Sequence, residues 1–129
     1  MNKNQKPFSL KERIQSFRFA FNGLKIFFKE EHNSRIHITA TFIVIVLGLY
    51  YKLSTIEWLV LLITIGFVIV IEIINTSIER LCNFLSTEKK EAIKIIKDLA
   101  AAAVLITSVI ALLEGLFIFI PKIFTSCFH

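Results

Sequence analysis

The sequence predicts an all-α membrane protein, with one N-terminal amphipathic surface helix followed by three transmembrane helices. Of its 129 residues, 55% are hydrophobic and only 19% are charged, which is far more apolar than a soluble domain of this length. Residues 36–51, 56–74 and 99–120 each form an apolar stretch close to the roughly 20 residues that a membrane-spanning helix needs. Strands cannot replace these helices, because an isolated strand leaves its backbone groups unpaired in hydrocarbon. We expect one domain over residues 1–129.

The N-terminal part has the pattern of a basic amphipathic helix over residues 9–31. Large apolar residues recur there at alternating steps of four and three, while lysines and arginines occupy other positions. We expect the apolar stripe to lie in the lipid at the cytoplasmic interface, with the basic side chains toward anionic headgroups. The alternative is a soluble helix that packs on a partner. The apolar positions are Leu10, Ile14, Phe17, Phe21, Leu24 and Phe28.

The connections between the spans differ in length. Residues 52–55 are too few for anything but a tight turn. The longer segment 86–98, STEKKEAIKIIKD, opens with Ser-Thr followed by two glutamates, which indicates the capped start of a helix. We expect that helix to lie at the membrane surface before the third span. The two prolines, Pro7 and Pro121, are expected to flank the structured part.

The basic residues are distributed unequally across the expected spans. Of the fifteen, all but Lys52 and Lys122 precede the first span or lie between the second and third. The positive-inside rule therefore places the N-terminus in the cytoplasm and the C-terminus outside. The net charge of +5 is then a property of the membrane surface, and no nucleic-acid partner is expected. Cys82 and Cys127 fall on opposite sides, so no disulfide is indicated.

The third span contains small residues that let helices approach closely in a bilayer. Three helices alone enclose little interior, so we expect the chain to associate with itself. The small residues are Ala100, Ala101, Ala102, Ala103, Ser108, Ala111 and Gly115.

The second span carries an unusual polar stripe near its cytoplasmic end. Glu72, Asn75 and Glu79 fall within about 60° of one another on a helix of 3.6 residues per turn. An ionised group in hydrocarbon costs roughly 2.5–3.5 kcal/mol, so such residues usually face the protein interior and mark a site. Two structural alternatives stay open: Glu72 pairs with a lysine of a neighbouring helix, or Glu79 is simply solvated.

Further charged residues are expected at the same membrane depth. Glu30 and Glu31 precede the first span, and Lys97 and Asp98 precede the third. Clustered acids repel one another unless a cation intervenes, and ligands that are all oxygen select a hard ion such as Mg²⁺. A magnesium site suggests a phosphate substrate whose charge Lys94 or Lys97 balances. The four glycines are scattered singly, so neither a P-loop nor a kinase glycine loop is present.

Three segments resemble those of a known enzyme family. EIINTSIE at 72–79, KDLAAAAVLI at 97–106 and EEHNSRIH at 30–37 are similar to the prokaryotic diacylglycerol kinase family, which includes the undecaprenol kinases. The resemblance covers roughly residues 16–120, and its pattern E-x-x-N-T-x-I-E is specific. It implies a homotrimer in the bacterial inner (cytoplasmic) membrane, which moves the γ-phosphate of ATP onto a lipid hydroxyl at the cytoplasmic face.

The resemblance also implies roles for the polar stripe. Glu72 would be the general base that takes the proton of the lipid hydroxyl, and Asn75 would orient the reacting groups. Glu79 and Glu31 would hold Mg²⁺ together with the nucleotide phosphates. Glu31 is preferred over Glu30 because it stands four positions before Arg35, the spacing expected in the family.

Nucleotide contacts are implied for Lys97 and Asp98. The family's N-terminal arginine matches either Arg13 or Arg18. One departure concerns Asn83, four residues after Glu79, where the family usually has an aspartate; an amide brings no negative charge, which weakens a metal or nucleotide contact without abolishing activity.

The lipid substrate is read less directly from the sequence. The segment RIH at 35–37 resembles the undecaprenol kinase branch, which favours undecaprenol slightly over diacylglycerol. His32 and His37 are five positions apart and do not share a helical face, so they are not expected to bind metal. The alternative function is a non-catalytic membrane scaffold or partner-docking module, which has no need for acids, an amide and a lysine at one membrane depth.

Overall fold

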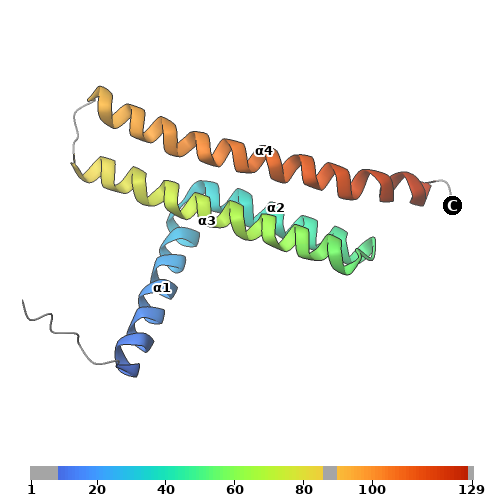
Figure 1. The fold of residues 1–129 in the computed structure, drawn as a ribbon, viewed down its shortest axis with the longest axis horizontal. Coiled ribbons are helices and arrows are strands. Elements are labelled where there is room, and N and C mark those ends of the chain that lie inside the picture. Colours follow the sequence, from blue (N-terminus) through green and yellow to red (C-terminus); the bar gives the residue numbers. More distant parts are fainter. Residues whose placement is uncertain (1–8, 86–89, 128–129) are drawn as a thin grey trace, which may run out of the picture. The chain divides into compact units, whose positions relative to one another are not determined.

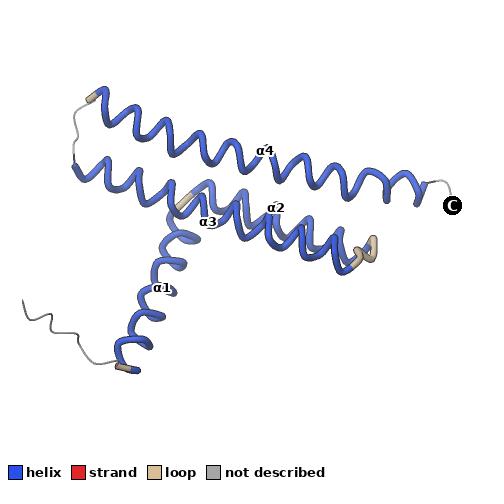
Figure 2. The backbone as a smooth tube through the Cα atoms, viewed as in Figure 1, coloured by secondary structure: helices blue, strands red, loops and turns tan. Residues whose placement is uncertain are grey.

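The computed structural model describes residues 9–85 and 90–127, and this part of the chain is helical apart from short loops (Figures 1 and 2). The all-α class is therefore confirmed. The helices are α1 (Leu10–Glu30), α2 (His32–Tyr50), α3 (Thr55–Leu85) and α4 (Glu91–Cys127).

Three of these helices, α2, α3 and α4, are long and apolar enough to cross a membrane, as the sequence predicted. Both α2 and α3 extend past the expected spans. Helix α2 begins at His32, and α3 continues beyond Ile74 to Leu85. The polar stripe of α3 thus lies inside a continuous helix and not at its frayed end.

The chain divides into two units after Glu31, and α1 forms the first. Ser9 caps this helix, because its hydroxyl accepts a hydrogen bond from the backbone N–H of Glu12 at 3.4 Å. At the other end Glu31 adopts extended backbone angles, φ −92° and ψ 124°, while its N–H donates to the carbonyl of Phe27. A helix is confirmed close to the expected bounds of 9–31, and its position at a membrane surface stays a prediction.

Helix α2 ends in a left-handed turn. Lys52 has a φ of 52°, and its N–H donates to the carbonyl of Leu49 at 3.3 Å. The N–H of Leu53 reaches back to the carbonyl of Gly48 at 3.0 Å. These two bonds form a Schellman motif, which satisfies carbonyls that the helix end would otherwise leave unpaired. The tight turn expected at 52–55 is confirmed.

Helix α3 starts with a capping box directly after that turn. The N–H of Ser54 donates to Glu57 Oε2 at 2.7 Å, and the N–H of Glu57 donates to Ser54 Oγ at 3.4 Å. The other carboxylate oxygen of Glu57 lies 2.9 Å from Lys122 Nζ on α4. One glutamate therefore caps α3 and joins it to α4.

The buried apolar core lies at this end of the bundle. Helix α3 packs most extensively on α4 and over a shorter stretch on α2. A Cβ atom added to Gly48 would lie 2.8 Å from the ring of Trp58, so the glycine permits the close approach of that ring. The core consists of Leu53, Leu61 and Phe119, with Val44, Leu47, Tyr51, Trp58, Ile65 and Ile118 packed around them.

Helix α4 corrects two expectations. Residues 91–98 form no separate surface helix, because α4 runs without a break from Glu91 to Cys127. Pro121 lies inside this helix and does not flank it. A proline lacks the N–H that would bond four residues back, but the helix continues on both sides of the missing bond. The Ser-Thr start expected at 86–87 lies outside the described residues.

Candidate functional site

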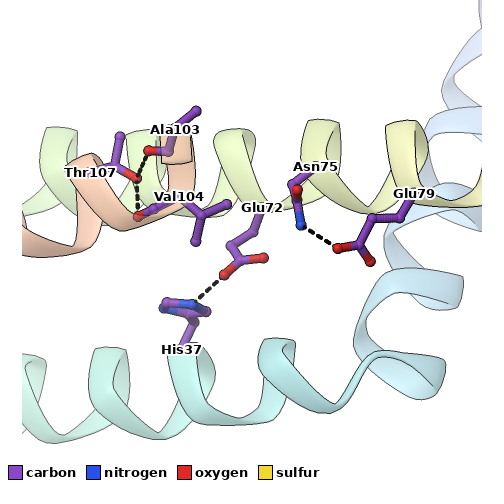
Figure 3. Close-up of polar contacts among 7 residues, drawn as sticks. All are labelled: His37, Glu72, Asn75, Glu79, Ala103, Val104 and Thr107. Carbon is purple, nitrogen blue, oxygen red and sulfur yellow. Dashed lines mark hydrogen bonds and ion pairs between the residues drawn. The ribbon is translucent and has the colours of Figure 1, made fainter. Parts of the chain in front are cut away.

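The polar stripe of α3 faces the protein interior. Glu72 is 2% exposed and Asn75 is 7% exposed, while Glu79, nearly two turns further along, is partly buried. Their side chains lie along one side of α3 (Figure 3). Glu79 is thus not fully solvated, because its side chain is partly buried and accepts a hydrogen bond from Asn75.

The Glu72 carboxylate is paired with a histidine of α2. His37 Nε2 lies 2.6 Å from Glu72 Oε1, although the two residues are 35 positions apart in the sequence (Figure 3). A buried carboxylate is costly unless it is hydrogen-bonded, and this imidazole supplies a donor. The partner of Glu72 is thus a histidine, whereas the sequence left open a lysine of a neighbouring helix.

Sequence reasoning missed His37 as a site residue. The sequence uses His37 only in the segment RIH that resembles the undecaprenol kinase branch, and its spacing from His32 argues against a metal pair. The available signal was a titratable side chain at the start of the first expected membrane span, the kind of position that usually faces the protein interior or a polar partner.

Asn75 and Glu79 form a second pair. The amide Nδ2 of Asn75 donates to Glu79 Oε1 at 3.3 Å (Figure 3). The other polar atom of this amide, Oδ1, is buried and has no hydrogen-bond partner within the described residues. An unsatisfied buried acceptor costs about 1–3 kcal/mol. This oxygen is therefore available to a donor on a bound molecule.

The hydroxyl of Thr107 on α4 is also buried, but it is already used. Its Oγ1 donates to the carbonyls of Ala103 and Val104 at 3.0 and 2.9 Å (Figure 3). Both bonds stay within α4. Thr107 therefore contributes volume to the interior without offering its proton to another side chain.

Lys97 on α4 forms a third pair with Asn83 on α3. Its Nζ donates to Asn83 Oδ1 at 2.7 Å on the exposed surface. Asn83 is the position where the resembled family usually has an aspartate. The amide keeps a hydrogen bond to the lysine but does not neutralise its charge. Asp98, the next residue along α4, is exposed.

Glu31, the other residue predicted to bind Mg²⁺, is the C-cap of α1 and belongs to the N-terminal unit. Its pairing with Glu79 stays a prediction. Over residues 9–85 and 90–127, no group of three or more His, Cys, Asp and Glu side chains is arranged to hold a metal by itself.

An apolar cavity of about 480 Å³ lies between α2, α3 and α4. His37 lines it at the end nearest Glu72, and Phe119 lines it near the buried core. Along α4 the lining extends from Ser108 to Phe119, which is about 16 Å at 1.5 Å per residue. The cavity therefore spans about half of the roughly 30 Å hydrocarbon layer of a bilayer.

A separate polar contact joins α3 and α4 away from the stripe. The hydroxyl of Thr64 donates to Glu114 Oε2, and the second carboxylate oxygen of Glu114 is buried without a partner in the described part of the chain. It links two apolar helices, as polar side chains do within membranes.

The fold and the buried stripe together define a small helical membrane protein with a polar site beside an apolar cavity. The sequence profile of the prokaryotic diacylglycerol kinase family matches residues 18–119. The chain belongs to this family. It is accordingly a lipid kinase and a multi-pass membrane protein.

Individual relatives agree with this assignment. The chain is 34% identical over 110 residues to the undecaprenol kinase of Bacillus subtilis (strain 168), a match that covers 85% of this chain and 89% of the relative. It is 32% identical over 111 residues to the diacylglycerol kinase of Synechocystis, covering 85% of this chain and 63% of the relative. A diacylglycerol kinase of Helicobacter pylori is 33% identical over 96 residues, covering 74% of this chain and 75% of the relative.

Proposed function

We propose that this chain transfers the γ-phosphate of ATP to the hydroxyl of a membrane lipid, and that undecaprenol is preferred over diacylglycerol. The observation that carries the proposal is the buried Glu72 carboxylate, bonded to His37 beside an apolar cavity. The preference is supported by the similarity to an undecaprenol kinase over most of both chains.

Glu72 is the general base in this proposal. The lipid hydroxyl gives its proton to Glu72, its oxygen bonds to the γ-phosphorus, and the bond from that phosphorus to the bridging oxygen breaks as ADP leaves. Phosphoryl transfer needs little covalent help from the protein, so positioning and charge neutralisation dominate. A base must lie within hydrogen-bond reach of the proton it takes. His37 occupies Oε1, which leaves Oε2 to accept this proton.

Asn75 orients the reacting groups. Its Nδ2 holds Glu79, while its buried Oδ1 accepts a hydrogen bond from a donor that enters with the substrates, such as an ordered water. A donor at this position would satisfy an acceptor that has no partner within the described residues.

Glu79 and Glu31 are proposed to hold Mg²⁺ with the nucleotide phosphates. Mg²⁺ usually binds through one or two carboxylates, several waters and substrate phosphates, so two glutamates are a fitting set of donors. When bound, the ion neutralises charge on the phosphates. Lys97 and Asp98 contact the nucleotide, and Lys97 adds a positive charge beside the phosphates.

The whole chain, residues 1–129, is proposed to act as one domain in the bacterial inner membrane. Helix α1 lies on the cytoplasmic surface with its apolar stripe in the lipid, the N-terminus and site face the cytoplasm, and the C-terminus lies outside. Three copies form a homotrimer. The family resemblance implies this assembly, and the large apolar side chains exposed on α2, α3 and α4 suit lipid or neighbouring copies.

The test is phosphate transfer from labelled ATP with Mg²⁺ to undecaprenol and to diacylglycerol in parallel detergent micelles. We expect transfer to undecaprenol in preference to diacylglycerol, and a loss of at least about 100-fold in kcat for Glu72→Gln, which is the lower range for removing a general base. Glutamine has nearly the size of glutamate but cannot take up the proton. Because the size is kept, the unfolding temperature of the Glu72→Gln variant should stay close to that of the native protein.

Two outcomes contradict the proposal. Faster transfer to diacylglycerol would reverse the assigned lipid preference. An absence of transfer to either lipid by a folded protein would favour the non-catalytic scaffold.

A further inference from the structure

We infer that His37 is a positioning residue, which holds one oxygen of Glu72 so that the other is aimed at the lipid hydroxyl. The inference rests on the proposed function, since it assigns a role next to the proposed base. His37 belongs neither to the polar stripe of α3 nor to the proposed nucleotide contacts.

The hydrogen bond between the two residues is short and shielded from solvent. The atoms are 2.6 Å apart, and the Glu72 side chain is only 3% exposed, against 22% for His37. With the proton on Nε2, the imidazole donates to Oε1 of the carboxylate. Hydrogen bonds to an ionised group are shorter and stronger than those between neutral groups. The contact therefore restrains Glu72 more than a solvent-exposed pair would.

A glutamate needs such a restraint at this place. Its side chain has three rotatable bonds, and burial has removed nearly all the water that would otherwise satisfy the carboxylate. A reacting group displaced by 1 Å can cost about 100-fold in rate. Fixing Oε1 from a different helix sets both the position of the carboxylate and the direction of Oε2.

His37 also occupies the boundary between the polar stripe and the cavity. It bonds Glu72 on one side and lines the apolar cavity with Ala40 and Ile69 on the other. A lipid whose tail enters the cavity would therefore bring its hydroxyl to the same imidazole that orients the base. The imidazole of His37 thus contacts both the cavity that would hold the lipid and the carboxylate that would take its proton.

The test compares four single variants in the full-length protein, using the undecaprenol assay. His37→Ala removes the donor. In His37→Gln the terminal amide nitrogen stands close to where Nε2 stood and can still donate, whereas the shorter His37→Asn stops near Nδ1 and cannot reach. Thr39→Ala is the matched control, because the Thr39 hydroxyl donates to the carbonyl of Arg35 within α2.

We expect kcat to fall by about 10- to 100-fold in the alanine and asparagine variants, the range set by a misplaced base. The lipid KM should change by less than about 3-fold, because the lost interaction acts in the transition state. The glutamine variant should recover kcat to within about 5-fold of the native protein, since positioning needs a donor and not an acid. The control should match the native protein.

Several results would overturn the inference. They are an alanine variant with native kcat, a loss confined to KM, or a glutamine variant as slow as the asparagine variant when both have native unfolding temperatures.

A double variant, His37→Ala with Glu72→Gln, should be no slower than Glu72→Gln alone, because residues that act as a unit are not additive. A further loss of rate in the double variant contradicts a role of His37 through Glu72. An inactive native protein would instead contradict the proposed function itself.

Discussion

Glu72 is buried, and its hydrogen bond comes from a helix other than its own. Desolvation of a carboxylate is offset here by one short hydrogen bond, so removal of the imidazole leaves a buried charge without that donor. Asn75 differs, because its Nδ2 donates to Glu79, whereas its Oδ1 has no hydrogen-bond partner within the described residues.

At the proposed nucleotide end of the site, Lys97 and Lys94 are both candidates to balance phosphate charge. We predict that Lys97→Met raises the KM for ATP by about tenfold or more, since a hydrogen bond to a charged group contributes about 1.5–3 kcal/mol. Lys94→Met is the matched control, one turn earlier on the same helix, and should change this KM by less than about twofold. Steady-state kinetics at saturating lipid measure both, and a larger effect at Lys94 would reverse the assignment.

Asn83 offers a second prediction at the same place. Asn83→Asp should convert its hydrogen bond with Lys97 into an ion pair and change the KM for ATP by less than about threefold, because exposed pairs contribute only about 0.2–1 kcal/mol. The same ATP titration checks this. A change of tenfold or more would mean that residue 83 contacts the metal or the nucleotide directly.

Residue chemistry was largely readable from the sequence, whereas residue partners were not. Helical periodicity places Glu72, Asn75 and Glu79 on one stripe before any tertiary contact is known. The His37 contact depends on how α2 is rotated and shifted against α3, which no local pattern records.

At the scale of elements, the α2–α3 turn determines how closely two spans approach. Lys52 adopts a left-handed conformation that glycine adopts more easily, and the Schellman motif compensates by satisfying helix-end carbonyls. Gly48, one turn earlier, leaves room for the Trp58 ring. The turn and this contact together place α2 against the start of α3.

We predict that Gly48→Ala destabilises the protein by about 1–3 kcal/mol, the usual cost of overpacking. The new methyl group would approach Trp58 to 2.8 Å, and that ring packs against the buried core and cannot easily move aside. Gly66→Ala is the control, since nothing lies within 4 Å of its added Cβ. Unfolding of both variants in detergent micelles provides the comparison; equal stabilities would show that Trp58 can be displaced at little cost.

Helix α4 illustrates why element boundaries were harder to predict than element types. The pattern over residues 86–98 is helical and polar, and it therefore predicts a separate surface helix. It is instead continuous with the third span from Glu91 onward, because nothing in the sequence between 91 and 99 breaks a helix. Pro121 could equally have ended the helix, since sequence alone does not show whether packing compensates for one missing hydrogen bond.

At the scale of the whole molecule, the arrangement separates two kinds of chemistry. Glu72 and its neighbours lie along the second half of α3, whereas the apolar core and the Glu57–Lys122 ion pair lie near its start. In the proposed function a lipid hydroxyl cannot leave the membrane and ATP cannot enter it, so the site would lie where the two meet.

The proposed orientation can be measured directly. In a chain with Cys82 and Cys127 replaced by serine, we predict that Lys52→Cys reacts with a membrane-impermeant maleimide in intact cells. Lys25→Cys should react only after the membrane is opened, because the positive-inside rule places α1 in the cytoplasm. The reverse labelling pattern would contradict the orientation and move the polar stripe to the outer face.

The sequence by itself determined the fold class, the three apolar helices, the polar stripe and the enzyme family, because composition, helical periodicity and the motif pattern are local properties of the chain. Tertiary structure decided which side chain pairs with Glu72, where α4 begins, and how an apolar cavity comes to lie beside the stripe. These features depend on the rotation and offset between helices. Many side chains distributed over α2, α3 and α4 set that packing together, so no single segment encodes it.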